Sequence, residues 1–417
     1  MNCRHCGSKL ERTFLDLGFA PPSNSYLSLQ DLSAPELYYP LRLSVCEHCW
    51  LVQTEDFARV GDLFKADYSY FSSVSSSWLD HCAVFVQAIT AKLGLGKESL
   101  VIEIAANDGY LLKNFVAADI PCLGIEPTDS TATAAESLGI PTVREFFGKE
   151  LASRLAAGGK QADLIIGNNV YAHVPDINDF TAGLKLALKQ GGTITLEFPH
   201  LLQLIEHDQF DTVYHEHFSY LSLYTVCRIF AEAGLRVWDV EELSTHGGSL
   251  RVYGGHAEDP RAAFPAVAAL LNDEEKQGLL RIGTYLDFQQ RADRVKDDLL
   301  MFLMEQKRAS RSIAAYGAAA KGNTLLNYAG IKRDLLPYVC DAAPSKQGKF
   351  LPGSHIPILA PAVLSERRPD VVLILPWNIA NEVMSQQDCV REWGGKFAVA
   401  VPTFRILERE PVPYSLH

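Results

Sequence analysis

The sequence has little positive charge, no long apolar run and no glycine-rich dinucleotide motif. Its 417 residues include 38 Lys and Arg against 50 Asp and Glu, which gives a formal charge of −12. This balance disfavours extended contact with a phosphate backbone, so we expect no nucleic-acid partner, although one anionic metabolite could bind in a local basic pocket. No run of 18 apolar residues is present, and Met1 leads straight into a cysteine motif instead of a signal sequence. The sequence therefore predicts a cytoplasmic protein without a membrane partner.

Two Cys-x-x-Cys pairs, 39 residues apart, predict a zinc site near the N-terminus. Two such knuckles can close a tetrahedral thiolate site, which is typical of structural zinc. A redox role is the weaker alternative, because no βαβ pattern surrounds either pair. The histidines inside the knuckles, His5 and His48, are expected to be exposed rather than to bind the metal. The predicted zinc ligands are Cys3, Cys6, Cys46 and Cys49.

A buried strand, a loop of small residues and a helix start follow one another between Leu100 and Lys113. In an α/β fold this order brings a ligand to the backbone amides at a helix N-terminus. Glu126 ends the next apolar stretch and could accept hydrogen bonds from ribose hydroxyls. The loop, Ala-Ala-Asn-Asp-Gly, has no Lys or Arg for phosphates. The predicted ligand is therefore an adenosine-type nucleoside without pyrophosphate, and S-adenosylmethionine is the leading candidate. The alternative is an ordinary turn between a strand and a helix.

Strands and helices alternate from 100 to 255, which predicts a mainly parallel sheet with ligand at the carboxyl ends of its strands. A second polar turn, Asn-Asn-Val-Tyr-Ala-His, occupies such an end. We expect the nucleoside to be bound by residues of these two loops, by the strand before the first loop and by Glu126, the acid expected to accept from the ribose hydroxyls. These are Glu103, Ala105, Asn107, Asp108, Gly109, Glu126, Asn168 and Asn169.

A second α/β unit begins at Ser312, after charge-mixed helices that read as connectors. Its first strand runs into Gly-Ala-Ala-Ala-Lys-Gly-Asn, a small-residue loop before a helix. This loop carries a lysine, Lys321, and can hold phosphate. A purely structural lid is the alternative. The Ser- and Tyr-rich segment from Glu55 to Ser77 predicts an ordered loop over a polar site, or else a simple connector.

The densest polar cluster is Tyr-His-Glu-His-Phe, from Tyr214 to Phe218. Histidine can take a proton near neutral pH, and an adjacent carboxylate can orient it. Tyrosine and a second histidine can stabilise a developing oxyanion. A metal site using His215 and His217 is the weaker alternative, since the sequence offers no third ligand.

Taken in order, these motifs resemble the sugar C-methyltransferases that act on nucleotide-linked keto-deoxysugars, of the tetronitrose and mycarose type. The resemblance covers the whole chain. It implies a class I methyltransferase-like parallel-sheet domain, a small N-terminal zinc-binding module and a C-terminal Rossmann-like α/β domain. The expected boundaries are 1–75 for the zinc module and active-site loop, 76–258 for the methyltransferase domain, 259–310 for connecting helices and 311–417 for the sugar-nucleotide-binding domain.

The resemblance also implies roles for individual residues. His217 would be the general base that removes the proton beside the ketone, and the zinc would lie far from the chemistry. The sugar pocket would be lined by Tyr214, Glu216, His173 and Tyr68, with Tyr70 as the alternative to Tyr68. The nucleotide diphosphate would be bound by Lys321, Gly322 and Asn323.

The implied reaction is methyl transfer from S-adenosylmethionine to a carbon next to a ketone, at C3 of a 4-keto-6-deoxy sugar. The base would create an enolate, whose carbon then attacks the methyl group. One alternative is an NAD-dependent sugar-nucleotide enzyme, which the lack of G-x-G-x-x-G disfavours. Another is a zinc-bearing scaffold without activity. The nucleotide base, the stereochemistry, a 3-amino group on the sugar and the oligomeric state are not encoded in any of these motifs.

Overall fold

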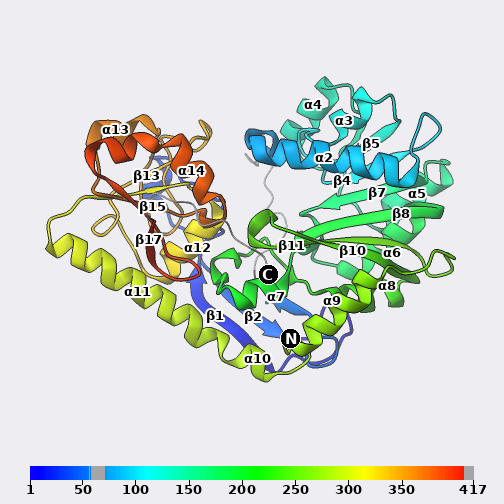
Figure 1. Ribbon diagram of the computed structural model, residues 1–417, viewed down its shortest axis with the longest axis horizontal. Coiled ribbons are helices and arrows are strands. Elements are labelled where there is room, and N and C mark those ends of the chain that lie inside the picture. Colours follow the sequence, from blue (N-terminus) through cyan, green and yellow to red (C-terminus); the bar gives the residue numbers. More distant parts are fainter. Residues whose placement is uncertain (56, 58–70, 408–417) are drawn as a thin grey trace.

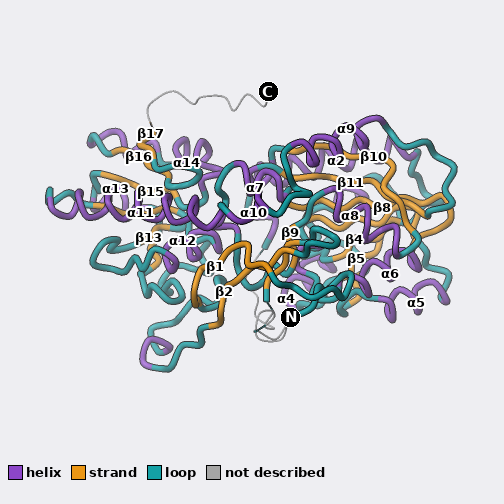
Figure 2. Tube along the Cα trace, turned by 90° about the horizontal axis from the view of Figure 1, so that it is seen from below, coloured by secondary structure: helices purple, strands orange, loops and turns teal. Residues whose placement is uncertain are grey.

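Three β-sheets organise the computed structural model (Figure 1). The structure describes residues 1–55, 57 and 71–407. Two α/β lobes stand side by side, and the smallest sheet lies below and between them. The view from below places β1, β2 and β9 in the middle of the molecule (Figure 2).

The smallest sheet is antiparallel and has four strands. Three of them come from the N-terminal module, and the fourth directly follows the Tyr-His-Glu-His-Phe segment, far along the chain. The sequence predicts no strand in this module, so the sheet goes beyond what its motifs indicate. Its strands, in spatial order, are β1 (Arg12–Ala20), β2 (Tyr39–Val45), β3 (Val52–Thr54) and β9 (Ser219–Tyr220).

The seven-stranded sheet is parallel except for β11, which runs antiparallel to both neighbours. All four residues of β4 are buried, as expected for a central strand that helices cover on both faces. Its strands, in spatial order, are β10 (Leu235–Leu243), β11 (Ser249–His256), β8 (Leu188–Pro199), β7 (Ala162–Asn168), β4 (Val101–Ile104), β5 (Cys122–Ile125) and β6 (Thr142–Val143). The prediction of a mainly parallel sheet is confirmed.

Helices cover the two faces of this sheet in two sets (Figure 1). One face carries α2 (Ser76–Leu93), α3 (Leu112–Ala117) and α4 (Asp129–Ser137). The other face carries α5 (Lys149–Ala157), α6 (Ile177–Ala187) and α8 (Leu223–Glu232). The short α7 (Leu201–Glu206) leads from β8 towards the four-stranded sheet.

The six-stranded sheet forms the second lobe, and only its last strand is antiparallel. The expected Rossmann-like pattern is confirmed. Its strands, in spatial order, are β14 (Ile358–Leu359), β13 (Val339–Cys340), β12 (Ile313–Tyr316), β15 (Val371–Ile374), β16 (Lys396–Val399) and β17 (Arg405–Leu407). Its helices are α12 (Ala320–Tyr328), α13 (Ala362–Arg367) and α14 (Ala380–Gln386).

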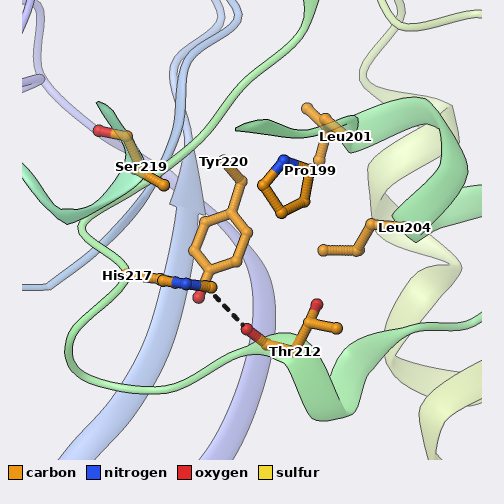
Figure 3. A pocket seen from close by; sticks show the side chains of 8 residues that line it. Pro199, Leu201, Leu204, Thr212, His217, Ser219 and Tyr220 are labelled. Carbon is orange, nitrogen blue, oxygen red and sulfur yellow. Dashed lines mark hydrogen bonds between the residues drawn. The ribbon is translucent and has the colours of Figure 1, made fainter. Parts of the chain in front are cut away.

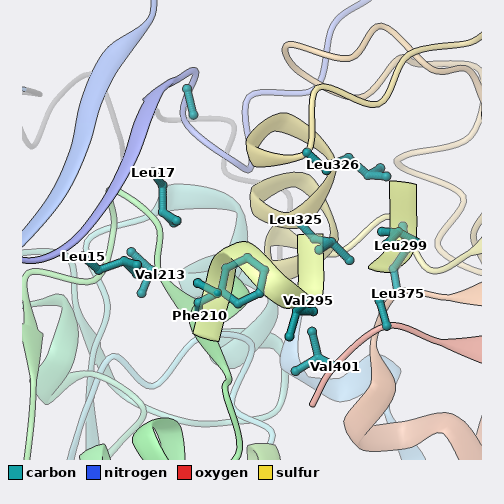
Figure 4. Packing of buried hydrophobic residues seen from close by; sticks show 14 of the residues in the cluster. Leu15, Leu17, Phe210, Val213, Val295, Leu299, Leu325, Leu326, Leu375 and Val401 are labelled. Carbon is teal, nitrogen blue, oxygen red and sulfur yellow. The ribbon is translucent and has the colours of Figure 1, made fainter. Parts of the chain in front are cut away.

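The connecting region is helical as expected, with α9 (Pro265–Lys276), α10 (Gly283–Leu286) and α11 (Phe288–Arg308). One hydrophobic core joins the four-stranded sheet, α11 and the second lobe (Figure 4). Within it, Phe14 of β1 stacks on Phe288 of α11 with ring centroids 4.8 Å apart. The N-terminal module and the C-terminal lobe therefore share one core. Across the described residues, no helix combines the length and apolar character needed to span a bilayer.

Candidate active site and zinc site

The four cysteines of the two knuckles lie together, with their sulfur atoms all within 4.8 Å of one another. Cys3 Sγ lies 3.5 Å from Cys49 Sγ, and Cys6 Sγ lies 3.6 Å from Cys46 Sγ. Sulfur atoms around tetrahedral zinc, at about 2.3 Å from the metal, have nearly this spacing. The donor set therefore fits Zn²⁺, held by four thiolates and closed to further ligands.

One expectation about the knuckles is wrong. His48 is exposed, but His5 is only 6% exposed. The Nδ1 atom of His5 lies 2.8 Å from the side-chain oxygen of Asn178 on α6, whose amide nitrogen donates to the carbonyl of His5. His5 is buried because the zinc module packs on the seven-stranded domain, and sequence spacing alone does not reveal that interface.

The loop after β4 has the tight shape of a nucleoside cradle. Ala105, Asn107 and Gly109 all have positive φ angles, at 58°, 49° and 78°. A side chain at Gly109 would also collide with Ile140, since a Cβ atom there would lie 2.5 Å from Ile140 Cδ1. Only glycine satisfies both limits at this position.

Glu126, at the end of β5, holds this loop from the neighbouring strand. Its carboxylate accepts hydrogen bonds from the backbone nitrogens of Asn107 at 3.0 Å and Thr128 at 2.9 Å. The segment before α2 closes on the same loop, since the backbone nitrogen of Ser72 donates to the Asn107 side chain and that of Ser73 to Asp108. The described end of the predicted Ser-rich loop thus contacts the cradle.

Two buried side chains around the cradle have polar atoms without a hydrogen-bond partner among the described residues. They are one oxygen of Asp108 and the whole amide of Asn168. The buried carboxyl of Glu103 lies beside the Tyr110 hydroxyl. Burial raises the pKa of Glu103 well above its usual range. Because buried polar groups are normally bonded, the atoms of Asp108 and Asn168 indicate a polar ligand. S-adenosylmethionine, with its amino, carboxylate and hydroxyl groups, fits this set.

The base predicted from the sequence, His217, is 8% exposed and held at both ring nitrogens. Its Nδ1 lies 3.0 Å from the carbonyl oxygen of Thr212 (Figure 3). A carbonyl only accepts, so Nδ1 carries the proton and Nε2 has the lone pair. The hydroxyl of Tyr214 lies 2.6 Å from Nε2 and donates to it. Burial, followed by the neighbouring His173, lowers the pKa of His217 well below its usual range.

The other predicted pocket residues surround this pair unequally. The ring of His173 meets that of His217 edge-on, with centroids 4.6 Å apart, and burial lowers the pKa of His173 to about 4. Glu216 faces the N-terminal module, where the amide of Asn24 donates to its two oxygens at 2.8 and 2.9 Å. These contacts make the Thr212 carbonyl, rather than Glu216, the group that orients the His217 ring. Tyr68 and Tyr70 lie outside the described residues.

A second histidine reaches the end of β7 from the Gly-rich turn after β10. The amide of Asn169 donates to Nε2 of His246 at 3.1 Å. Trp78 of α2 packs against His246 and Tyr110, with ring centroids 5.5 and 6.0 Å away. The first turn of α2 therefore lies against both the cradle and the second polar turn.

Lys321, in the first turn of α12, is half-buried where the second lobe meets the first. Its ammonium donates to the side-chain oxygen of Asn378 at 2.6 Å and lies 4.6 Å from the centre of the Trp377 ring. Trp377 in turn donates to the carboxylate of Asp211 at 2.8 Å. Burial raises the pKa of Asp211 to about 6, against the opposing charge of Lys321. Burial lowers the pKa of Lys321, which Asp211 partly counteracts.

The other two predicted phosphate contacts are packed differently. Asn323 is fully buried, and its amide donates to the backbone carbonyl of Ser23 at 2.6 Å. Gly322 lies under Leu375, where a Cβ atom would approach the leucine side chain to 2.8 Å. Of the three residues, Lys321 alone has a charged group at the junction of the lobes.

The first βα loop of the second lobe is closed by its own neighbours. Asp341, the acid after β13, accepts from the backbone nitrogens of Ala318 and Ala343 at 2.7 and 2.8 Å. Tyr26 and Lys346 both donate to the carbonyl of Ala318, at 2.5 and 2.9 Å. In dinucleotide-binding folds this acid binds ribose and this loop binds pyrophosphate, so these contacts argue against the NAD-dependent alternative.

Sequence reasoning missed three residues that hold the site together. The carbonyl of Thr212 orients His217, and the amide of Asn24 holds Glu216. The carboxylate of Asp211 accepts a hydrogen bond from Trp377 at the junction of the lobes. No periodicity or motif marks Asn24. Asp211 and Thr212 lie immediately before the polar cluster, and that proximity is the one signal that could have identified them.

Family models match three consecutive parts of the chain. Residues 3–64 match a zinc binding domain, 80–240 a methyltransferase domain and 244–402 a C-methyltransferase C-terminal domain. The C-methyltransferase NovU of Streptomyces niveus is 33% identical over 408 residues, covering 98% of this chain and 97% of the relative.

Two solved structures resemble part of the chain. An S-adenosylmethionine-dependent methyltransferase from Clostridium acetobutylicum ATCC 824 is 11% identical and covers 47% of this chain and 95% of that chain, with a TM-score of 0.34. The magnesium protoporphyrin IX methyltransferase ChlM from Synechocystis PCC 6803, with bound donor, is 14% identical and covers 43% and 77%, with a TM-score of 0.32.

The full-length relative and the matched models agree with the geometry of the cradle and the knuckles. They confirm S-adenosylmethionine and structural zinc as the cofactors expected from the sequence. The chain is an enzyme that belongs to the C-methyltransferase family.

Proposed function

We propose that this enzyme methylates the carbon next to a ketone in a nucleotide-diphosphate-linked keto-deoxysugar, at C3 of a 4-keto-6-deoxy sugar. The observation that carries the proposal is the Tyr214–His217 pair, whose ring is fixed by the Thr212 carbonyl and whose lone pair is on Nε2. In this assignment residues 76–258 bind the donor and 311–417 bind the sugar nucleotide. S-adenosylmethionine, when bound, supplies an electrophilic methyl group.

An aliphatic carbon is a poor nucleophile until it loses a proton. A neighbouring ketone makes that proton acidic, because the C–H electrons can move into an enolate. The lowered pKa of His217 keeps the ring neutral at pH 7, so Nε2 is able to accept the proton. The hydroxyl of Tyr214 donates a hydrogen bond to that lone pair, so Nε2 cannot take the substrate proton while this bond persists. In one path the Tyr214 hydroxyl turns away to donate to the enolate oxygen, and Nε2 takes the proton directly. In the other path Tyr214 passes its own proton to Nε2 while its oxygen takes the substrate proton.

The enolate needs positive or hydrogen-bonding groups around its oxygen, since His217 is a weak base once buried. Tyr214 and His173 are the nearest candidates to the His217 ring. Lys321 lowers the pKa of His217 through its charge and therefore lies within electrostatic reach of the same site. We assign Lys321 to the diphosphate, with the first backbone amides of α12 beside it.

Methyl transfer from labelled donor to a panel of TDP-, GDP- and CDP-linked 4-keto-6-deoxysugars tests the substrate class. We expect transfer to at least one of them, and transfer to none would overturn the sugar assignment. A position-specific assay of the product by NMR then identifies the methylated carbon.

Exchange in heavy water separates proton removal from methyl transfer. Enzyme, sugar nucleotide and S-adenosylhomocysteine should introduce deuterium beside the ketone, and His217→Asn should abolish this exchange. His207→Asn, at an exposed histidine ten residues earlier in the chain, is the matched control and should exchange normally.

Tyr214→Phe should keep exchange if Nε2 takes the proton directly and lose it if Tyr214 relays the proton. If a shielded proton returns to the carbon, a primary isotope effect on methyl transfer replaces exchange as the readout. Normal exchange in His217→Asn would exclude His217 as the base.

A further inference from the structure

A short strand of the zinc module pairs with the chain directly after His217. β3 begins three residues after Cys49 and pairs antiparallel with β9, so that Gln53 lies opposite Ser219. At the end of β3 the backbone nitrogen of Thr54 donates to the carbonyl of Phe218 at 3.2 Å. The Thr54 hydroxyl donates to the carbonyl of His217 itself at 3.0 Å. The backbone of the base is therefore held by the strand that leaves the second knuckle.

The first knuckle is bonded to the same strand. Gln53 is fully buried, its side-chain oxygen accepts from the backbone nitrogen of Arg4 at 2.9 Å, and its amide donates to Cys3 Sγ at 3.3 Å. A buried amide with both ends bonded fixes the distance between strand and knuckle. Thr225 on α8 adds a third tie, to the carbonyl of Cys49 at 3.3 Å.

Arg4, between two zinc ligands, spans both histidine segments. One guanidinium nitrogen donates to the carbonyl of Thr54 at 2.9 Å, and another donates to the carbonyl of Pro175 at 2.8 Å, two residues after His173. The guanidinium also lies 5.4 Å from the centre of the Phe218 ring. One side chain of the knuckle thus contacts the neighbours of both His217 and His173, whose rings meet edge-on.

We propose that the zinc module is a positioning element for the catalytic histidines, and that Arg4 and Thr54 are its positioning residues. The proposal rests on the proposed role of His217 as the base. Zinc fixes the two knuckles against each other, Gln53 fixes β3 to the first knuckle, and Thr54 with Arg4 fixes the backbone that carries His217. In this proposal the metal acts through the placement of the base.

The size of the effect follows from how steeply proton transfer depends on geometry. A misplacement of about 1 Å can cost roughly 100-fold in rate. Val has nearly the shape of Thr but lacks the hydroxyl, so Thr54→Val should leave packing intact and release the His217 carbonyl. We expect it to slow deuterium exchange and kcat by about 10-fold or more. Thr54→Ser keeps the donor and should restore most of the rate.

Arg4→Ala should slow both rates as much or more, and Arg4→Lys should restore little, because an ammonium cannot bond two separate carbonyls in the fixed geometry of a guanidinium. Arg12→Ala is the control within the module, since the Arg12 side chain pairs with exposed Glu47 at the surface. All variants should keep one zinc per chain by elemental analysis. Their affinity for S-adenosylhomocysteine and their KM for the sugar nucleotide should change by less than about 2-fold, because the contacts described for Arg4 and Thr54 lie beside the two histidines and within the zinc module.

A readout without substrate separates this proposal from the proposed function. Protein labelled with ¹⁵N-histidine reports the protonated nitrogen of His217, and His217→Asn identifies its signal. We expect wild-type protein, Thr54→Ser and Arg12→Ala to share one His217 signal, and Thr54→Val and Arg4→Ala to shift or broaden it. If no keto-sugar is turned over, the proposed function fails while this arm still decides the positioning role. An unchanged His217 signal in both variants, or a loss of zinc or donor affinity that accompanies the loss of rate, would overturn the proposal.

Discussion

Replacing Glu126 by glutamine tests the donor cradle with the smallest change in shape. Glu126 is 5% exposed, and each of its oxygens accepts one backbone N–H, from Asn107 at 3.0 Å or Thr128 at 2.9 Å. A carboxylate has about four acceptor positions, so roughly two remain for the ribose hydroxyls. The glutamine side chain would present an NH₂ group on one side. The NH₂ group could not accept a hydrogen bond, either from the backbone nitrogen or from a ribose hydroxyl.

The expected loss can be worked out from these contacts. Hydrogen bonds to charged groups contribute about 1.5–3 kcal/mol each, and removing the charge weakens those that remain. Losing one net bond to the ribose should therefore raise the dissociation constant of the donor by roughly 10- to 150-fold. The loop held by Asn107 would also loosen, which lowers the melting temperature of the ligand-free protein.

Calorimetry with S-adenosylhomocysteine measures the affinity, because this product has the ribose but transfers no methyl group. Glu136→Gln is the control, since Glu136 is exposed on α4 and pairs with Arg144 at 2.7 Å. It should leave the affinity unchanged. If Glu126→Gln binds the product as tightly as wild-type protein, Glu126 does not hold the ribose and the reasoning is refuted.

Two further predictions concern charge. Lys321→Met should raise KM for the sugar nucleotide by about 10-fold or more and leave donor affinity unchanged, because it removes one charge-assisted contact to the diphosphate; a matching loss of donor affinity would place Lys321 in the wrong site. Burial lowers the pKa of His217 well below its usual range and that of His246 to about 4, so the unfolded chain binds more protons as pH falls below about 6.5. The free energy of unfolding should then decrease from about pH 6.5 towards about pH 4, and His217→Asn should flatten that decrease in melting scans; equal slopes in the two proteins would contradict the shift.

The sequence identified those parts of the fold that depend on local pattern. The strand Val101–Ile104 and the loop after it follow one another in the chain, so their order and residue types are enough to predict a cradle. The same holds for Ile313–Tyr316 and the loop of the second lobe. Polar residues at carboxyl ends of parallel strands could be placed near each other because α/β topology brings those ends to one edge.

The groups that complete the site could not be predicted, because they come from distant parts of the chain. Asn24 and Glu216 are 192 residues apart. β3 and β9 pair over only two positions, too few for an alternating pattern to be visible. The group that orients His217 is a backbone carbonyl, which every residue has. His5 was expected to be exposed because nothing in a knuckle reports what packs on it.

The core shared by the two ends of the chain has a consequence for the order in which the protein forms. Asp16 of β1 bonds to Gln289 of α11, and these residues lie 273 positions apart. A ribosome that adds roughly 5–20 residues per second needs about 14–55 s to travel from one to the other. During that interval the whole seven-stranded domain emerges, while Phe14 of β1 still lacks Phe288, on which it stacks in the folded protein. We expect early metal uptake by the knuckles to keep this first segment compact until α11 arrives.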